Sequence, residues 1–264
     1  MKMSPFLPQS SQVYRPSFFD LSRPMDRLAF DDLLHRFPQL ELVDQIETQL
    51  HALMEALQIS NYEQISRFLE DELGGRTFEQ YGVWVYYPWL HKVVHLLPRE
   101  AFYQLRLTEE ELDVEPGRKV GIADAQRSWP LVRRLVREQA CTELRIASSL
   151  PVGLQQFRLL EAGIHELGQS PSIRLARQIA ELDPYLPIRC YDDPLAEDFF
   201  LEGGKLDLLI DGTPKLSQHD RLHQRAAALG VPVIPRLEPG ESYSFREMPA
   251  VRPDGHLASA ASGR

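Results

Sequence analysis

The sequence has few cysteines and no long apolar run. Its two cysteines, Cys141 and Cys190, lie too far apart in the chain to supply the paired ligands of a structural zinc site or the framework of a secreted disulfide-rich protein. No run of about 18 apolar residues is present, so no segment is expected to span a membrane. The first 20 residues lack the apolar core and flanking positive charge of a signal peptide. We therefore expect a soluble, cytoplasmic protein without a membrane partner.

Dense basic segments are also missing. The chain has 38 acidic and 29 basic residues, which gives a formal net charge of -9. The basic clusters Arg133-Arg134-Arg137 and Arg221-Arg225 have helical spacing, and solvated helix faces explain them. Binding to nucleic acid requires clustered Lys and Arg that neutralise phosphates, so a nucleic-acid partner is not expected.

Composition and periodicity divide the chain into four regions. Residues 1–30 are rich in proline and serine and predict an extended arm. Residues 31–112 predict a helical hairpin followed by a β-hairpin. Residues 113–248 have the pattern of an α/β domain, and the Ala-, Ser- and Gly-rich residues 249–264 predict a disordered tail.

The N-terminal region contains two predicted helices. Apart from Leu42, apolar residues recur over Leu40–Leu57 at the spacing of one helical stripe, which predicts a helix over that range. Ser60 and Glu63 match a capping box, so a second helix is expected to begin at Ser60. Gly74-Gly75 is expected to end it.

The following segment predicts a β-hairpin and a short helix. Tyr81–Leu97 contains two apolar runs joined by a turn that includes Pro88. Pro98 is a favoured first position of a helix, and this helix is expected to extend to Leu105.

From Arg118 onward, short apolar runs alternate with amphipathic stretches. Strands are predicted at 118–123, 143–147, 187–191, 206–210 and 231–235. Helices are predicted near 129–140, 172–182, 194–201 and 216–229. Runs of Val, Ile and Leu separated by helices are typical of a parallel sheet covered on both faces. The predicted fold class is therefore α/β: a Rossmann-like, doubly wound, mostly parallel sheet with an N-terminal extension.

In such a sheet, the turn after the first strand is the expected phosphate-binding position. These turns are rich in glycine because Cβ atoms block the approach of the backbone to phosphate. Here only Gly121 remains, within the strand, and Asp124 places a carboxylate where phosphate would lie. That carboxylate repels phosphate unless a metal or Arg127 intervenes. Gly121, Asp124, Arg127 and Ser128 are candidate nucleotide contacts, and a purely structural turn is the alternative.

Three other positions could contribute chemistry. Ser148 follows the second strand and could hydrogen-bond a ribose, although capping of the next helix is the simpler explanation. Asp211 ends the fourth strand and is a candidate functional carboxylate, although turn chemistry before Gly212 also explains it. His219 and His223 lie four residues apart on a predicted helix. They could face one metal, but no third ligand is evident, so no metal site is predicted.

Six segments occur in the same order as in the ThiF/MoeB/HesA family of ubiquitin-activating-enzyme-like adenylyltransferases, which the chain resembles over roughly residues 78–240. The segments are Tyr81–Leu97, Lys119–Gly121, Cys141–Ala147, Ala162–Gly168, Ala176–Pro184 and Gly203–Ile210. The resemblance is to a bacterial branch in which some members carry a nitroreductase-like domain after the ThiF-like part. It identifies residues 113–248 as the ThiF-like Rossmann domain.

This resemblance implies a homodimer that binds ATP and magnesium, with an arginine contributed to the neighbouring subunit's site. A carboxylate attacks the α-phosphate and forms an acyl-adenylate, commonly on the C-terminal glycine of a ubiquitin-like carrier protein. Asp211 and Arg158 are the candidate catalytic residues that the resemblance leaves in this chain.

Most of the family's other functional positions are replaced. Ser148 and Leu150 stand at the acidic pair after the second strand, and Gln156, Arg158 and Leu159 stand near the family's Asn and Arg. Pro171 stands near the phosphate-binding Lys, and Pro214 stands at the magnesium-handling Asp. Adenylation requires cations and preorganised donors around the α-phosphate. These replacements therefore predict a degraded adenylyltransferase.

The primary functional hypothesis is a pseudoenzyme that acts as a binding or assembly partner. It would form a homodimer, or a heterodimer with a related or nitroreductase-like protein, and a ubiquitin-like carrier is a further candidate partner. One alternative is an active adenylyltransferase with a rearranged site that uses Arg127, Arg158 and Asp211. Another is a Rossmann-type nucleotide or dinucleotide binder, although the Gly-x-Gly-x-x-Gly fingerprint is missing.

Overall fold

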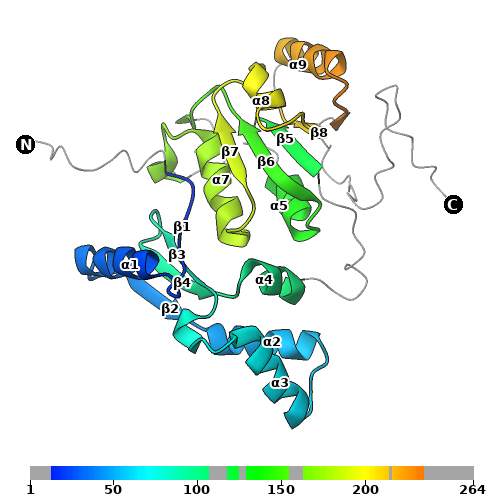
Figure 1. Cartoon of the computed structure of the whole chain (residues 1–264). Coiled ribbons are helices and arrows are strands. Elements are labelled where there is room, and N and C mark those ends of the chain that lie inside the picture. The colour runs from blue at the N-terminus through cyan, green and yellow to red at the C-terminus, as the bar shows by residue number, and fades with distance from the viewer. Residues whose placement is uncertain (1–12, 107–117, 125–128, 155–162, 214–215, 235–264) are drawn as a thin grey trace, which may run out of the picture. The chain divides into compact units, whose positions relative to one another are not determined.

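The computed structural model describes residues 13–106, 118–124, 129–154, 163–213 and 216–234. The chain divides into two compact units, Met1–Asp113 and Val114–Arg264 (Figure 1). None of the helices in the described part of the chain has the length and apolar character needed to cross a membrane.

The first unit is built on a mixed sheet. Its described strands are β1 (Ser17–Phe19), β2 (Glu41–Asp44), β3 (Val83–Tyr87) and β4 (Lys92–Leu96), in the order β1-β3-β4-β2. Strands β3 and β4 form an antiparallel hairpin, β1 pairs antiparallel with β3, and β2 pairs parallel with β4. The hairpin predicted for Tyr81–Leu97 is confirmed.

The helices of this unit contribute to two separate buried apolar clusters. The helices of the unit are α1 (Pro24–Arg36), α2 (Ile46–Ala56), α3 (Tyr62–Leu73) and α4 (Arg99–Arg106), with a short 3-10 turn at Phe78–Gln80. Phe30 of α1 packs with Trp84 and Tyr86 in one buried apolar cluster. Leu50 and Leu53 of α2 pack with Leu97 in a second cluster.

The extended arm predicted for residues 1–30 is wrong from Ser17 onward. Strand β1 begins there and pairs with β3, and α1 begins at Pro24. Proline is suited to the first turn of a helix because its missing N–H would have no partner there. Leu21 is buried between these two elements. The proline-rich composition had suggested an arm, but the pairing with β3 lies more than 60 residues away and is not visible locally.

The helix predicted over Leu40–Leu57 is also wrong in its first part. Residues 41–44 form β2, and α2 begins only at Ile46. Asp44 Oδ1 accepts the Ile46 N–H at 3.2 Å and satisfies one of the free donors of the first helical turn.

The next helix, α3, is capped by Asn61 rather than by the predicted Ser60, because the Asn61 side chain accepts the Gln64 N–H. Its predicted end is confirmed, since Gly74 has the left-handed φ of 55°.

A buried histidine of β4 joins this strand to β2 and to the segment that leads into β3. His95 is 0% exposed and stacks on Trp84, with ring centroids 4.2 Å apart. One ring nitrogen, Nδ1, lies 2.9 Å from Asp44 Oδ1 and the other, Nε2, lies 2.7 Å from the Tyr81 carbonyl oxygen. Both nitrogens of this ring are therefore used within the fold.

The second unit has the strand order of a Rossmann fold. Its described strands are β5 (Arg118–Ala123), β6 (Cys141–Ala147), β7 (Ile188–Tyr191), β8 (Leu208–Asp211) and β9 (Val233–Ile234). They form a parallel sheet in the order β7-β6-β5-β8-β9. Counted along the chain this order is 3-2-1-4-5, the order of the nucleotide-binding doubly wound folds. The predicted fold class is confirmed.

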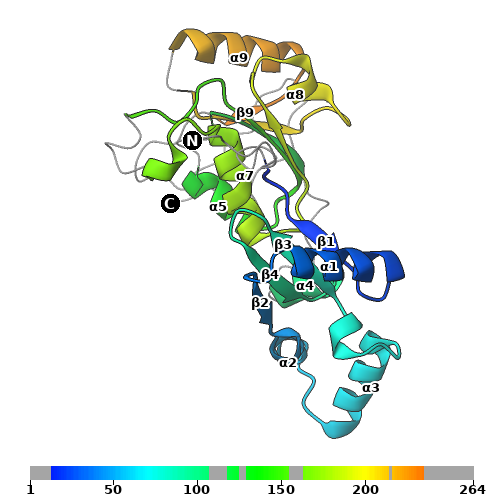
Figure 2. The ribbon, with the colours of Figure 1, turned by 90° about the vertical axis from the view of Figure 1, so that its left-hand side faces the viewer.

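Helices connect these strands and cover the sheet. They are α5 (Trp129–Arg137), α7 (Pro171–Leu182), α8 (Glu197–Leu201) and α9 (Leu216–Ala228), with a short 3-10 turn at Ile164–Glu166. Figure 2 shows α5 and α7 side by side, and the two helices are in contact. Phe199 and Phe200 of α8 and Leu222 of α9 pack in one core cluster with inward-facing residues of β5, β6 and β8. The order change between β5 and β8 fixes the expected ligand position at the carboxyl ends of these strands.

Candidate functional site

At the carboxyl ends of β5 and β8, backbone hydrogen bonds join the residue after each strand to the neighbouring strand. Asp124 follows β5 directly, and its N–H donates to the Ala147 carbonyl oxygen at 2.9 Å. Gly212 follows β8, and its N–H donates to the Ala123 carbonyl oxygen at 2.8 Å. Asp124 adopts a left-handed φ of 59°, which a short polar residue tolerates better than most. The backbone thus leaves the strand conformation at Asp124, the position predicted to approach phosphate.

Gly121 lies inside β5, paired with Arg145 of β6 and Leu209 of β8. A Cβ atom at this position would lie 2.5 Å from Leu206 Cδ1 and 3.0 Å from Phe199 Cζ. Close packing against α8 and the chain before β8 therefore explains why this residue is glycine. The predicted contact with phosphate has no support from this placement.

Three of the predicted contacts, Arg127, Ser128 and Arg158, lie outside the described residues, as do Gln156 and Pro214. Ser148 is described and is 7% exposed at the end of β6, where its N–H donates to the Tyr191 carbonyl oxygen at 3.2 Å. Pro171, which stands near the family's phosphate-binding lysine, is buried in the first turn of α7.

Asp211 is a buried and extensively bonded carboxylate at this edge. Its side chain is 1% exposed. The oxygen Oδ1 accepts two hydrogen bonds from Thr213, one from the backbone N–H at 2.8 Å and one from the hydroxyl at 2.6 Å. This is the turn chemistry expected of an Asp at a strand end, and it holds the carboxylate in one orientation.

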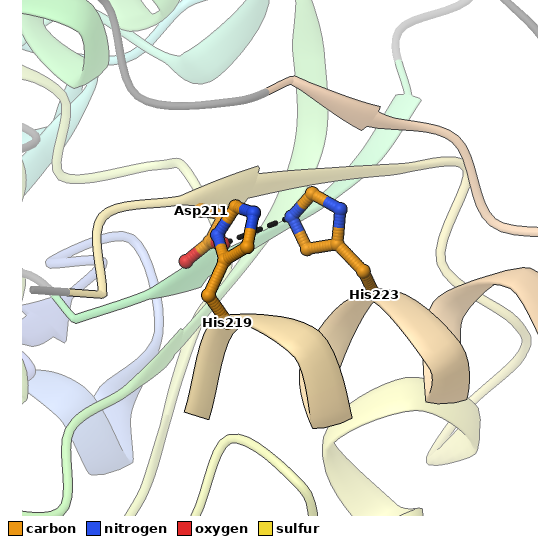
Figure 3. A group of neighbouring side chains, drawn as sticks. All are labelled: Asp211, His219 and His223. Atoms are coloured by element: carbon orange, nitrogen blue, oxygen red, sulfur yellow. Dashed lines mark hydrogen bonds and ion pairs between the residues drawn. The ribbon is translucent and has the colours of Figure 1, made fainter. Parts of the chain in front are cut away.

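The second oxygen of Asp211 faces two histidines of α9 (Figure 3). His219 Nδ1 lies 2.5 Å from Oδ2 and His223 Nε2 lies 3.0 Å from the same atom. The two imidazoles are neighbours, with ring centroids 3.8 Å apart, as expected for residues one turn apart on a helix. We call Asp211, His219 and His223 the Asp–His–His cluster.

The sequence had suggested no third ligand for His219 and His223, and the structure supplies one. The carboxylate oxygen and the two ring nitrogens lie within 4.8 Å of one another, which is close enough to bind one metal ion. The missed signal was topological. Helix α9 follows β8 after a short connection, so its first turns return to the strand end that carries Asp211.

A second set of charged residues lies beneath α8 and is used within the core. Arg145 is 0% exposed, and its guanidinium donates to Glu143 at 2.9 Å and to the carbonyl oxygens of Phe199 and Gly204 at 3.2 and 2.7 Å. A buried charge with these partners stabilises the position of α8. The Arg145 guanidinium is therefore used within the core rather than for binding a ligand.

Tyr191 at the end of β7 is coupled to the acidic side chain of Glu202. Its hydroxyl donates to Glu202 Oε2 at 2.8 Å. Burial, together with this hydrogen bond and the charge of Glu202, raises the pKa of Tyr191 to about 12. The same hydrogen bond, helped by Arg189, lowers the pKa of the Glu202 carboxyl. The phenol therefore remains protonated through the neutral range.

Cys141 is unsuited to nucleophilic chemistry. It is 8% exposed at the start of β6, and burial, reinforced by the negative charge of Asp183, raises the pKa of its thiol. Because the thiolate is the reactive form, this residue is inert near neutral pH.

No family model matches the chain. The chain is 30% identical over 213 residues to "Uncharacterized protein MT1398" of Mycobacterium tuberculosis (strain CDC 1551 / Oshkosh), a match that takes in 77% of this chain and 28% of the relative. The chain thus spans little more than a quarter of the length of this curated relative.

Three solved structures share part of the shape. TcdA (CsdL) is 13% identical with a TM-score of 0.42, over 50% of this chain and 57% of that chain. E. coli TcdA in complex with ATP is 14% identical with a TM-score of 0.40, over 50% and 58%. E. coli MccB with ATP is 12% identical with a TM-score of 0.38, over 72% and 58%. Likeness at this level assigns neither a ligand nor an activity to the chain.

Proposed function

We propose that this chain is a ThiF/MoeB/HesA-like Rossmann protein that no longer adenylates a substrate and that acts as a binding or assembly component. The family resemblance of the sequence and the 3-2-1-4-5 strand order support the ancestry. The loss of chemistry is supported by the state of the edge at which ATP and magnesium would bind.

The observation that carries the proposal is the engagement of Asp211. This is the carboxylate retained next to the family's magnesium-handling position, yet Thr213 occupies Oδ1 and two histidines face Oδ2. Magnesium binds oxygen ligands in a strict octahedral arrangement and keeps several waters. A carboxylate that is 1% exposed and faces imidazole nitrogens does not offer that environment.

The other described residues at the carboxyl edge of the sheet are also unsuited to binding ATP and magnesium. Asp124 adds a negative charge beside the expected phosphate position, Gly121 is used for packing, and Pro171 is buried where a lysine would be needed. Adenylation develops additional negative charge on the α-phosphate, and losing one preorganised donor typically slows such a step by about 10²-fold or more. The described residues therefore do not fit magnesium-bound ATP.

The length of the curated relative bears on the proposed partners. The matched segment forms 28% of that protein, so in the relative it is joined to a large amount of further sequence. We propose that this chain likewise works together with additional protein: a second copy of itself, a related ThiF-like chain or a nitroreductase-like protein. Light scattering of the purified chain, alone and mixed with such a chain, measures which assembly forms.

Titration calorimetry with ATP and magnesium, combined with an ATP–pyrophosphate exchange assay, tests the loss of adenylation. A working ThiF-like adenylyltransferase with its carrier serves as the positive control. We expect no saturable heat and no exchange above the protein-free background. Tight binding accompanied by pyrophosphate exchange, abolished in Asp211→Ala, would instead establish an active enzyme with a rearranged site.

A further inference from the structure

We propose that the Asp–His–His cluster is a binding site for a single transition-metal ion of the zinc class. Two imidazole nitrogens and one carboxylate oxygen form a donor set that suits zinc and its neighbours, whereas magnesium and calcium prefer oxygen ligands. This inference does not depend on whether the chain has retained adenylation.

The first argument is the convergence of the donor atoms. His219 Nδ1 and His223 Nε2 both point at Asp211 Oδ2, at 2.5 and 3.0 Å (Figure 3). Ligands placed about 2.0–2.2 Å from a tetrahedral zinc ion lie about 3.4 Å from one another. An ion can therefore enter between the three atoms after each has moved by less than about 1 Å.

The second argument is that the ligands are held by the fold. The histidines are four residues apart on α9, a spacing that places two rings on the same face of a helix. Asp211 ends β8, and Thr213 holds Oδ1 with two hydrogen bonds, which leaves Oδ2 to face the imidazoles. Outer-shell hydrogen bonds of this kind orient metal-binding carboxylates.

The third argument concerns access. The side chains of His219 and His223 are 36% and 33% exposed, so an ion can reach the nitrogens from solvent while Asp211 forms the buried floor. Three protein ligands leave one position of a tetrahedral ion for water or a small ligand. This arrangement is typical of zinc sites that bind a further molecule, whereas structural sites usually have four protein ligands.

The alternative to metal binding is a purely structural role, in which the histidines only neutralise a buried carboxylate. Thr213 already provides Asp211 with two donors, and His223 Nε2 forms a hydrogen bond with Oδ2. His219 Nδ1 lies 2.5 Å from the same oxygen, so a second histidine nitrogen stands beside a carboxylate that the fold already satisfies. A metal site requires donor atoms from several residues around one point, and the three donor atoms of the cluster lie within 4.8 Å of one another.

The test uses the full, untagged chain after treatment with a chelator. Titration with zinc is followed by calorimetry, and titration with cobalt is followed by its visible absorption, which becomes intense in a tetrahedral site. The variants are His219→Ala and His223→Ala, both at partly exposed positions, with His165→Ala as a matched control because that histidine is exposed in the same unit. Circular dichroism verifies that each variant is folded.

We expect one equivalent of zinc to bind the wild-type chain and His165→Ala with equal affinity. Each of His219→Ala and His223→Ala should weaken binding by more than about 100-fold, which is the upper range for losing a mere supporting contact. Absence of binding to the wild-type chain would overturn the proposal. Wild-type affinity in either His219→Ala or His223→Ala would also overturn it.

Discussion

Two histidine–aspartate arrangements within the described residues differ in how the ring nitrogens are used. In the first unit, His95 is fully buried, stacks on Trp84, and uses Nδ1 with Asp44 and Nε2 with the Tyr81 carbonyl oxygen. In the second unit, His219 and His223 are about one third exposed, and each directs one nitrogen to Asp211. The burial is reversed as well, because Asp44 is 48% exposed whereas Asp211 is 1% exposed.

The difference separates a histidine that maintains a fold from histidines available to a ligand. A ring with both nitrogens occupied and no exposed surface has no capacity left for another partner. Two rings that converge from solvent on one buried oxygen define a space that a cation can occupy.

Replacing His95 by alanine should have the largest effect. It removes a fully buried ring, its stacking on Trp84 and two hydrogen bonds. The free energy of unfolding of the first unit should fall by about 3 kcal/mol. Urea unfolding followed by tryptophan fluorescence measures it, and His51→Ala, which changes an exposed histidine of α2, is the matched control. A loss below about 1 kcal/mol would show that His95 is not important for maintaining the fold of the first unit.

Zinc should stabilise the second unit. At a free zinc concentration of 100 times the dissociation constant, binding to the folded state alone adds about 2.7 kcal/mol. Thermal unfolding with and without zinc should show this gain in the wild-type chain and in His165→Ala. An equal gain in His223→Ala would place the ion elsewhere.

Without metal, His223→Ala should have little effect on stability. The side chain is 33% exposed, and Asp211 retains its bonds to Thr213 and His219. The expected loss is below about 1 kcal/mol, because partly exposed ion pairs contribute little. A loss as large as that of His95→Ala would show that this histidine also maintains the fold, contrary to the comparison.

The smallest effect is expected at high pH. The pKa of Tyr191 is raised from 10.0 to about 12, so the folded state holds this proton more tightly than the unfolded chain. Its contribution to stability is complete below pH 10 and is lost as the pH rises toward 12. Spectroscopic titration of tyrosinate absorbance should show one late-titrating tyrosine that is missing in Tyr191→Phe. If the late component persists in Tyr191→Phe, the assignment to this residue is wrong.

Much of the Rossmann unit could be predicted from the sequence. Strand β8 is a short, mostly apolar run buried along its whole length, and the run at Arg118–Ala123 matches β5 at both ends. The N-terminal unit was harder because its sheet depends on distant pairing. Val43 fits a helical stripe, although Leu42 does not, and these two residues of β2 pair with Val94 and Val93 of β4.

The candidate site was only partly predictable. Asp211 was identified because it ends a strand at the carboxyl edge, and His219 and His223 were noticed for their spacing. Their meeting at one oxygen atom depends on the path from β8 to α9, which spacing alone does not specify. The use of Gly121 for packing depends likewise on Phe199 and Leu206, which are about 80 residues away in the chain.

A crystal structure of the chain soaked with ATP, magnesium and zinc together, with anomalous data collected at the zinc edge, would distinguish a zinc site from a working nucleotide site. We expect a zinc peak between Asp211, His219 and His223 and no ordered triphosphate at the ends of β5 and β8. An ordered ATP with magnesium bound to Asp211 would contradict it.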